Sequence, residues 1–125
     1  MATRGGWREA GRKKVEVSRS EIGSVGVMRL SGPFVAEECA KLTEKIDACI
    51  ADGTSKIVID MKQVPFIDSA GLETLQLLVP ELARRGADFR ITGLNDVCRD
   101  TLVATRMMSF LHISEDAESA VRSFR

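Results

Sequence analysis

The 125-residue sequence has no excess of charge of either sign and no long apolar run. Lys and Arg total 18 and Asp and Glu total 18, so the formal net charge at pH 7 is zero. A neutral chain has no global field that attracts nucleic acid or an anionic membrane. No apolar run approaches the roughly 20 residues of a membrane span, and the first residues lack the apolar segment of a secretory signal. We therefore expect a cytoplasmic protein with no membrane span and no direct nucleic-acid partner.

Cysteine and histidine are scarce, with three residues of the first and one of the second. Cys39, Cys49 and Cys98 form no CxxC pair, and His112 is the only imidazole. Cys39 and Cys49 fall in one predicted helix, where ten residues rise about 15 Å, which is too far for a disulfide. We expect buried, reduced thiols, and we predict neither a metal site nor another cofactor.

The motifs of common catalytic and nucleotide-binding sites are also missing. The sequence contains no G-x-x-x-x-G-K-[ST] loop and no G-x-G-x-x-G turn after a strand. Around Ser69 the nucleophile-elbow pattern G-x-S-x-G is incomplete, because Ile67 stands where the first glycine belongs. The only candidate base, His112, lies in a short apolar context more typical of a core or edge residue. We predict that the protein is not an enzyme.

The composition that is present suits one folded domain. Hydrophobic residues make up 44% of the chain and charged residues 29%, enough to bury a core within 125 residues. The first 14 positions differ, because they carry five basic residues, one acid and no apolar period. Without a folded platform, such a segment binds nucleic acid or anionic lipid only weakly. We expect residues 1–12 to form a basic, disordered tail and residues 13–125 to form the domain.

Periodicity predicts the elements of that domain. Apolar and polar residues alternate at 15–18, as in a strand with one buried face. A turn at 21–23 and a second strand at 24–30 would complete an antiparallel hairpin. Apolar residues then recur every three or four positions over 35–50, which predicts an amphipathic helix. Glu37 and Glu38 favour its first turn by their charge.

The second half of the chain alternates strands and helices. Lys56–Asp60 contains three consecutive β-favouring apolar residues, typical of a central strand covered on both faces. A leucine stripe from Leu72 to Leu82 predicts a second helix, which Gly86 ends and Pro80 should kink. Further predicted elements are a strand at 88–92, a helix capped by Asn95 or Asp96, an extended piece at 111–113 and a final helix from about Glu115.

The resulting order is β-β-α-β-α-β-α-β-α, which predicts a single α/β domain. A hairpin that feeds successive β-α-β units gives a mixed sheet of four to five strands with right-handed crossovers. Only the third strand reads as apolar on both faces, so we expect the helices mainly on one face of the sheet. A partly open opposite face could support a homodimer.

The segment Asp68–Leu72 has two interpretations. In the first, Asp68 or Ser69 caps the second helix by accepting a hydrogen bond from an N–H two or three residues later. In the second, Ser69 is displayed for another protein, at the kind of strand-to-helix junction where α/β sheets place their sites. A phosphate on a helix N-terminus is tolerated by its own domain. From the residues alone, the cap is the favoured explanation.

The same segment lies within a longer pattern, IVIDMKQVPFIDSAGLETL at 57–75. It resembles the signature of the STAS family, the sulfate-transporter and anti-sigma-factor-antagonist domains. The shared features are an apolar strand ending in Asp60, the Asp68-Ser69 pair after Ile67, a small residue at position 70, and a Gly-Leu pair. The order of elements from 15 to 124 is also similar, whereas Pro80 departs from the unbroken helix of the family.

This resemblance implies a stand-alone anti-sigma factor antagonist that works by partner switching in transcription regulation. Its partner would be an anti-sigma factor, a serine kinase with a histidine-kinase-like ATPase fold, which phosphorylates Ser69 and then separates. A serine phosphatase would restore the unmodified form. We expect the partner-binding surface to comprise the following residues: Asp68, Ser69, Ala70, Gly71, Leu72, Glu73, Gln76, Gly32, Pro33 and Phe34. Phe34 is either an exposed anchor or a residue packed against the helix start.

An alternative keeps the same fold and the same surface. Some stand-alone members of the family are soluble subunits of membrane transport systems, here of an ABC-type lipid transporter. In that case Ser69 would be a contact residue without a phosphate.

Overall fold

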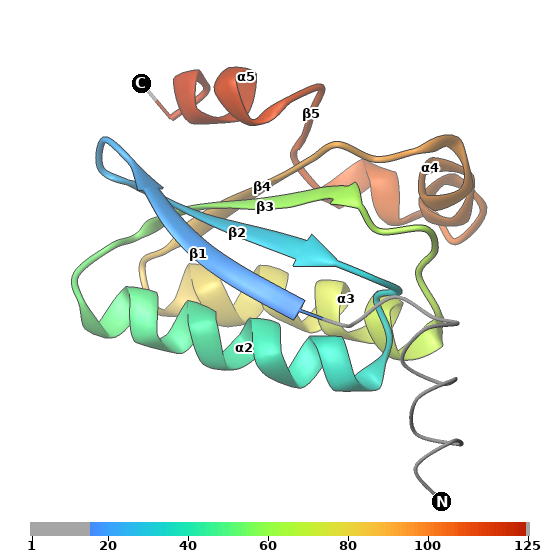
Figure 1. The fold of residues 1–125 in the computed structure, drawn as a ribbon, viewed down its shortest axis with the longest axis horizontal. Coiled ribbons are helices and arrows are strands. Elements are labelled where there is room, and N and C mark those ends of the chain that lie inside the picture. The colour runs from blue at the N-terminus through green and yellow to red at the C-terminus, as the bar shows by residue number, and fades with distance from the viewer. Residues whose placement is uncertain (1–15, 125) are drawn as a thin grey trace, which may run out of the picture.

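The computed structural model describes residues 16–124, so the predicted tail at 1–12 lies outside the described residues. The domain contains one five-stranded sheet in the order β1-β2-β3-β4-β5 (Figure 1). The elements along the chain are β1 (Glu16–Ile22), β2 (Val25–Ser31), α2 (Ala36–Ala51), β3 (Lys56–Gln63), α3 (Ser69–Arg84), β4 (Asp88–Thr92), α4 (Asp96–Ala104), the 3₁₀ helix η1 (Met107–Phe110), β5 (Ile113–Ser114) and α5 (Ala117–Arg122). This confirms the predicted α/β class and element order.

The sheet is mixed, as the hairpin and the β-α-β units predicted. β1 pairs antiparallel with β2, and all later neighbours pair in parallel. The hairpin is tighter than expected, because pairing continues to Ile22↔Val25 and leaves only Gly23 and Ser24 in the turn. Gly23 has φ +61, a backbone conformation that costs glycine little.

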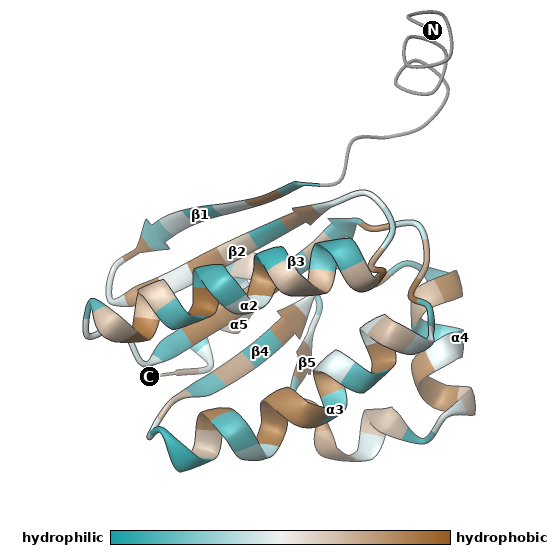
Figure 2. Cartoon of the chain, turned by 90° about the horizontal axis from the view of Figure 1, so that it is seen from below, coloured by the Kyte–Doolittle hydropathy of each residue, from teal (hydrophilic) through white to brown (hydrophobic). Residues whose placement is uncertain are grey.

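The helices lie unequally on the two faces of the sheet. α2 and α3 cover one face, and α5 lies on the opposite side (Figures 1 and 2). The larger core lies beneath α2 and α3, and it includes Ile59, Leu42 and Leu75, none of which is exposed. A smaller cluster on the α5 side contains Val58 and Ala120. Successive residues of β3 thus enter different cores, which confirms the strand predicted to be covered on both faces and the helices mainly on one face.

The helix α3 runs as one element from Ser69 to Arg84, with Pro80 inside it. Its buried side contains Leu75, Leu78 and Leu82. Pro80 lies on the exposed side, where its missing N–H leaves the carbonyl of Gln76 without the usual helical donor. Because Gln76 is also exposed, solvent can reach that part of the helix.

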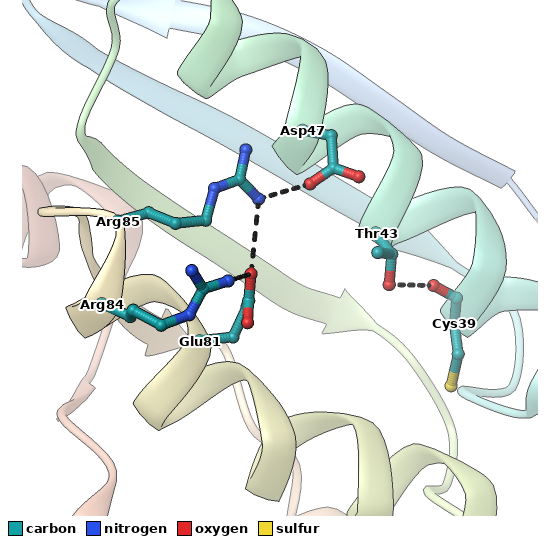
Figure 3. Close-up of polar contacts among 6 residues, drawn as sticks. All are labelled: Cys39, Thr43, Asp47, Glu81, Arg84 and Arg85. Atoms are coloured by element: carbon teal, nitrogen blue, oxygen red, sulfur yellow. Dashed lines mark hydrogen bonds and ion pairs between the residues drawn. The ribbon is translucent and has the colours of Figure 1, made fainter.

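Polar contacts join α2 to the end of α3 (Figure 3). The Arg85 guanidinium lies 2.6 Å from Oδ1 of Asp47 on α2, and Arg84 lies 2.6 Å from Oε2 of Glu81. Solvent screens such exposed ion pairs, so they contribute little to stability. The burial of the leucine stripe therefore dominates the packing of α3, and only the Arg85–Asp47 pair joins the end of α3 to α2.

The three cysteines are buried and unpaired, as predicted. Burial raises the pKa of each of the three thiols, Cys39, Cys49 and Cys98. None of the helices between residues 16 and 124 is long and apolar enough to cross a bilayer.

Candidate functional site

Ser69 is exposed at the first position of α3. The residue before it, Asp68, has an extended backbone and caps the helix, because its Oδ1 accepts the Gly71 N–H at 2.9 Å. The sequence did not decide whether Asp68 or Ser69 caps the helix, and in the structure the capping residue is Asp68. The hydroxyl of Ser69 is therefore available to solvent and is not used to satisfy the helix N-terminus.

Two turns joined by backbone hydrogen bonds hold Ser69 in place. The Phe34 N–H donates to the Phe66 carbonyl at 3.0 Å, and the Asp68 N–H donates to the Phe34 carbonyl at 3.3 Å. Phe34 and Ile67 thus form a short parallel bridge between the start of α2 and the start of α3. We call residues 32–34 and 66–72 the platform, because they position the exposed Ser69 as one unit.

Gly71 is buried within this platform. A Cβ built at Gly71 would lie 2.5 Å from the carbonyl oxygen of Phe34 and 2.8 Å from Cγ2 of Ile67. Both distances are shorter than real Cβ contacts, so a side chain at this position would push the two turns apart. Gly71 therefore allows the close approach of α3 to the turn before α2.

Of the two alternatives left open for Phe34, the structure shows the packed residue and not the exposed anchor. Its side chain is 0% exposed and belongs to the larger core, because the chain turns inward after Pro33 to pair with Ile67. Gly32 and Gly71, also predicted to bind the partner, are buried as well. These three residues shape the platform from beneath and present no side chain to a partner.

The other predicted residues lie at the surface. Ser69, Glu73 and Gln76 are exposed along α3, and the half-buried ones are Asp68, Ala70, Leu72 and Pro33. The structure brings them together around the start of α3, because residues 32–34 and 66–68 are hydrogen-bonded to each other.

Two exposed apolar residues of this surface were not predicted. Phe66 is 44% exposed three residues before Ser69, and Leu77 is 62% exposed on α3. The signals were present, because Phe66 precedes buried Ile67 in an extended segment where neighbours face opposite ways. Leu77 follows Glu73 by four residues and so shares its helix face. It also lines a groove of ≈ 480 Å³ between α2 and α3, together with Thr43 and Thr74.

The electrostatics at Ser69 favour an anion. The first turn of α3 contains no acidic residue, and the partial positive charge of the helix N-terminus is offset by the capping Asp68 and by Glu73, one turn after Ser69. The Cys39 thiol on α2 donates a weak hydrogen bond of 3.6 Å to the Ala70 carbonyl in the first turn of α3. A negative group added at Ser69 would thus project from a rigid helix start into solvent.

The family model described as STAS domain matches residues 16–120, nearly the whole described domain. The chain belongs to the STAS family. The predicted resemblance is therefore confirmed, and the Asp68-Ser69 pair lies within the matched STAS region.

Solved structures of similar proteins share the STAS fold. An anti-sigma factor antagonist from Mycobacterium paratuberculosis is 21% identical, with a TM-score of 0.76 over 88% of this chain and 93% of that one. A sulfate transporter family protein from Wolinella succinogenes is 20% identical, with a TM-score of 0.73 over 83% of this chain and 87% of that one. The Bacillus cell fate determinant SpoIIAA in its phosphorylated form is 17% identical, with a TM-score of 0.64 over 90% of this chain and 100% of that one. At these identities the likeness establishes the fold.

Proposed function

We propose that this STAS domain is an anti-sigma factor antagonist whose binding to an anti-sigma factor is switched off by phosphorylation of Ser69. The observation that carries the proposal is the division of roles at the start of α3. Asp68 caps the helix through its 2.9 Å bond to the Gly71 N–H, while the Ser69 hydroxyl remains exposed. The structural likeness to an anti-sigma factor antagonist and to a phosphorylated determinant supports it.

In this proposal the chain is the substrate of a kinase and not a catalyst. The Ser69 Oγ attacks the γ-phosphorus of ATP held by the anti-sigma factor kinase, the bond to the ADP oxygen breaks, and a base of the kinase takes the hydroxyl proton. The product carries about −1.5 to −2 charges at neutral pH. A serine phosphatase then hydrolyses the phosphoserine and restores the binding form.

The platform explains how the phosphate acts on a partner without unfolding its own domain. The positive end of α3 stabilises an added negative charge, and the buried Phe34 and Gly71 beneath it are unaffected. A partner that packs against Ser69 and the exposed Phe66 would instead have to desolvate or oppose that charge. A hundredfold loss of affinity corresponds to about 2.7 kcal/mol, which one opposed interfacial phosphate can supply.

The test is phosphorylation by the cognate anti-sigma factor kinase with ATP, followed by intact mass measurement. We expect one phosphate on the wild type and none on Ser69→Ala. Ser109→Ala is the matched control, because Ser109 is also exposed but lies in η1. We expect the Ser109→Ala variant to receive one phosphate on Ser69, as the wild type does. Phosphate on Ser69→Ala, or tight kinase binding by Ser69→Asp, would contradict the proposal.

A second function keeps the surface and changes the partner. The structural likeness to a sulfate transporter family protein favours a soluble subunit of a membrane transport system, such as an ABC-type lipid transporter. Ser69 would then be a contact residue that receives no phosphate. A neighbouring gene for a kinase-like anti-sigma factor supports the first function, and a transporter operon supports the second.

A further inference from the structure

Glu38 is a buried acid in the first turn of α2. The residue is 0% exposed, and neither carboxyl oxygen makes a hydrogen bond of ordinary geometry with residues 16–124, although the Ser31 backbone N–H lies near enough to favour the carboxylate. A buried, unpaired carboxylate is strongly unfavourable, whereas the neutral carboxylic acid is tolerated. Glu37 and Glu38 both lie in the first turn of α2, as predicted, but Glu38 is buried whereas Glu37 is exposed.

The surroundings of Glu38 favour its protonated form. Burial raises its pKa to about 7, and the negative charges of Glu37 on α2 and Glu16 on β1 act in the same direction. The backbone of Ser31 on β2 and the ammonium of Lys41 on α2 act against the shift but do not cancel it. Glu16 and Ser31 are partners across the hairpin, so Glu38 faces the end of β1 and β2 nearest the platform.

The segment that contains Glu38 is continuous with the platform. Val35, the N-cap of α2, makes no side-chain capping bond, unlike Asp68 at the start of α3. One residue before Val35, Phe34 accepts from the Asp68 N–H and donates to the Phe66 carbonyl. A movement of the first turn of α2 therefore acts directly on the backbone that positions Ser69.

We propose that Glu38 is a proton-dependent lock beneath the platform. With its carboxyl neutral, the first turn of α2 stays packed against the hairpin and the platform is held in the described geometry. Loss of the proton drives the carboxylate toward solvent, loosens the first turn of α2 and, through residues 32–34, loosens the platform. This device does not depend on the identity of the partner, and it would make partner binding sensitive to pH near neutrality.

The direction of the pH dependence follows from linkage. The pKa of Glu38 rises from 4.5 to about 7 on folding, so the folded state holds its proton more tightly than the unfolded state. The stabilisation is fully present below 4.5 and is lost as pH rises through about 7. From about pH 5.5 to about pH 8.5, this group alone lowers the folding equilibrium constant about 30-fold.

The experiment is urea unfolding of the isolated chain over this pH range, in the wild type, Glu38→Gln and Glu37→Gln. The amide of Glu38→Gln mimics the neutral acid, so we expect its stability to lack the 30-fold decline. Glu37→Gln is the matched control, because Glu37 is the exposed neighbour in the same turn, and we expect it to follow the wild type. If the folding stability of Glu38→Gln declines with pH as much as that of the wild type, the proposal is wrong.

Two-dimensional NMR tests the link to the platform without any variant. We expect the wild-type amides of Phe34, Ser69 and Gly71 to shift with the same midpoint as the Glu38 carboxyl carbon, near pH 7. A carboxyl that titrates near its ordinary value, or platform amides that do not follow it, would overturn the proposal. Because no partner is present, this outcome is independent of whether the chain binds an anti-sigma factor.

Discussion

The carbonyl oxygen of Phe34 lies so close to Gly71 that a β-carbon on Gly71 would come within 2.5 Å of it. The clash is with backbone, which cannot rotate away as a flexible side chain could. We expect Gly71→Ala to destabilise the domain by about 1–3 kcal/mol, typical of overpacking in a filled interior. Urea unfolding measures this, and Gln76→Ala on the exposed side of α3 should change stability by less than about 0.5 kcal/mol.

Removal of the cap at Asp68 should loosen the helix start while Ser69 stays in place. Asp68→Ala loses the 2.9 Å bond to the Gly71 N–H, and we expect a cost of about 1 kcal/mol. Asp68→Asn keeps an acceptor at the same position and should retain most of the stability. Equal thermal midpoints for Asp68→Ala and the wild type would show that the cap contributes nothing.

Truncation to alanine should affect folding stability most at Phe34 and partner affinity most at Phe66. Phe34 is fully buried, so we expect Phe34→Ala to cost about 3–5 kcal/mol of stability. Phe66 is 44% exposed and therefore only partly buried, so Phe66→Ala should cost about 1–2 kcal/mol, well below the cost of Phe34→Ala. In the proposed interface around Ser69, the Phe66→Ala change should weaken partner binding by at least about 1 kcal/mol. Unfolding and titration calorimetry separate the two effects, and unchanged affinity in Phe66→Ala would remove it from the interface.

A permanent charge at position 69 should leave the domain folded. Ser69→Asp places a carboxylate at the positive end of α3, where the helix dipole contributes about 0.3–1 kcal/mol, partly offset by repulsion from Asp68 and from Glu73 four residues later. We expect the stability of Ser69→Asp to lie within about 1 kcal/mol of Ser69→Asn, its neutral match in size. A larger loss of stability in Ser69→Asp would contradict the claim that a phosphate acts on the partner alone.

The regular elements were predictable because each has its own period. The apolar stripe of α2, the three consecutive apolar residues of β3 and the leucines of α3 each appear in the sequence, and the structure confirms them. The Asp68-Ser69 junction was found because a strand, a short polar segment and a helix follow one another within a few residues.

Burial within irregular segments was not predictable in the same way. Phe34 is buried because residues 32–34 pair with 66–68, a contact between segments far apart in the chain. The exposure of Phe66, by contrast, could have been inferred from its alternation with Ile67. Glu38 was a different case, because it lies four residues before Leu42 and eight before Ile46, on the buried stripe of α2. The helical period therefore indicated its burial, but an acid in a first turn was interpreted by its charge alone.

The burial of all three native cysteines has a practical consequence for spectroscopy. Their thiols are shielded, and burial raises the pKa of each, so few reactive thiolates form at neutral pH. A Ser69→Cys variant would then present a single accessible sulfur at the start of α3. A maleimide dye or spin label attached there would report arrival and departure of a bound protein in real time, on a chain whose own sulfurs need not be removed.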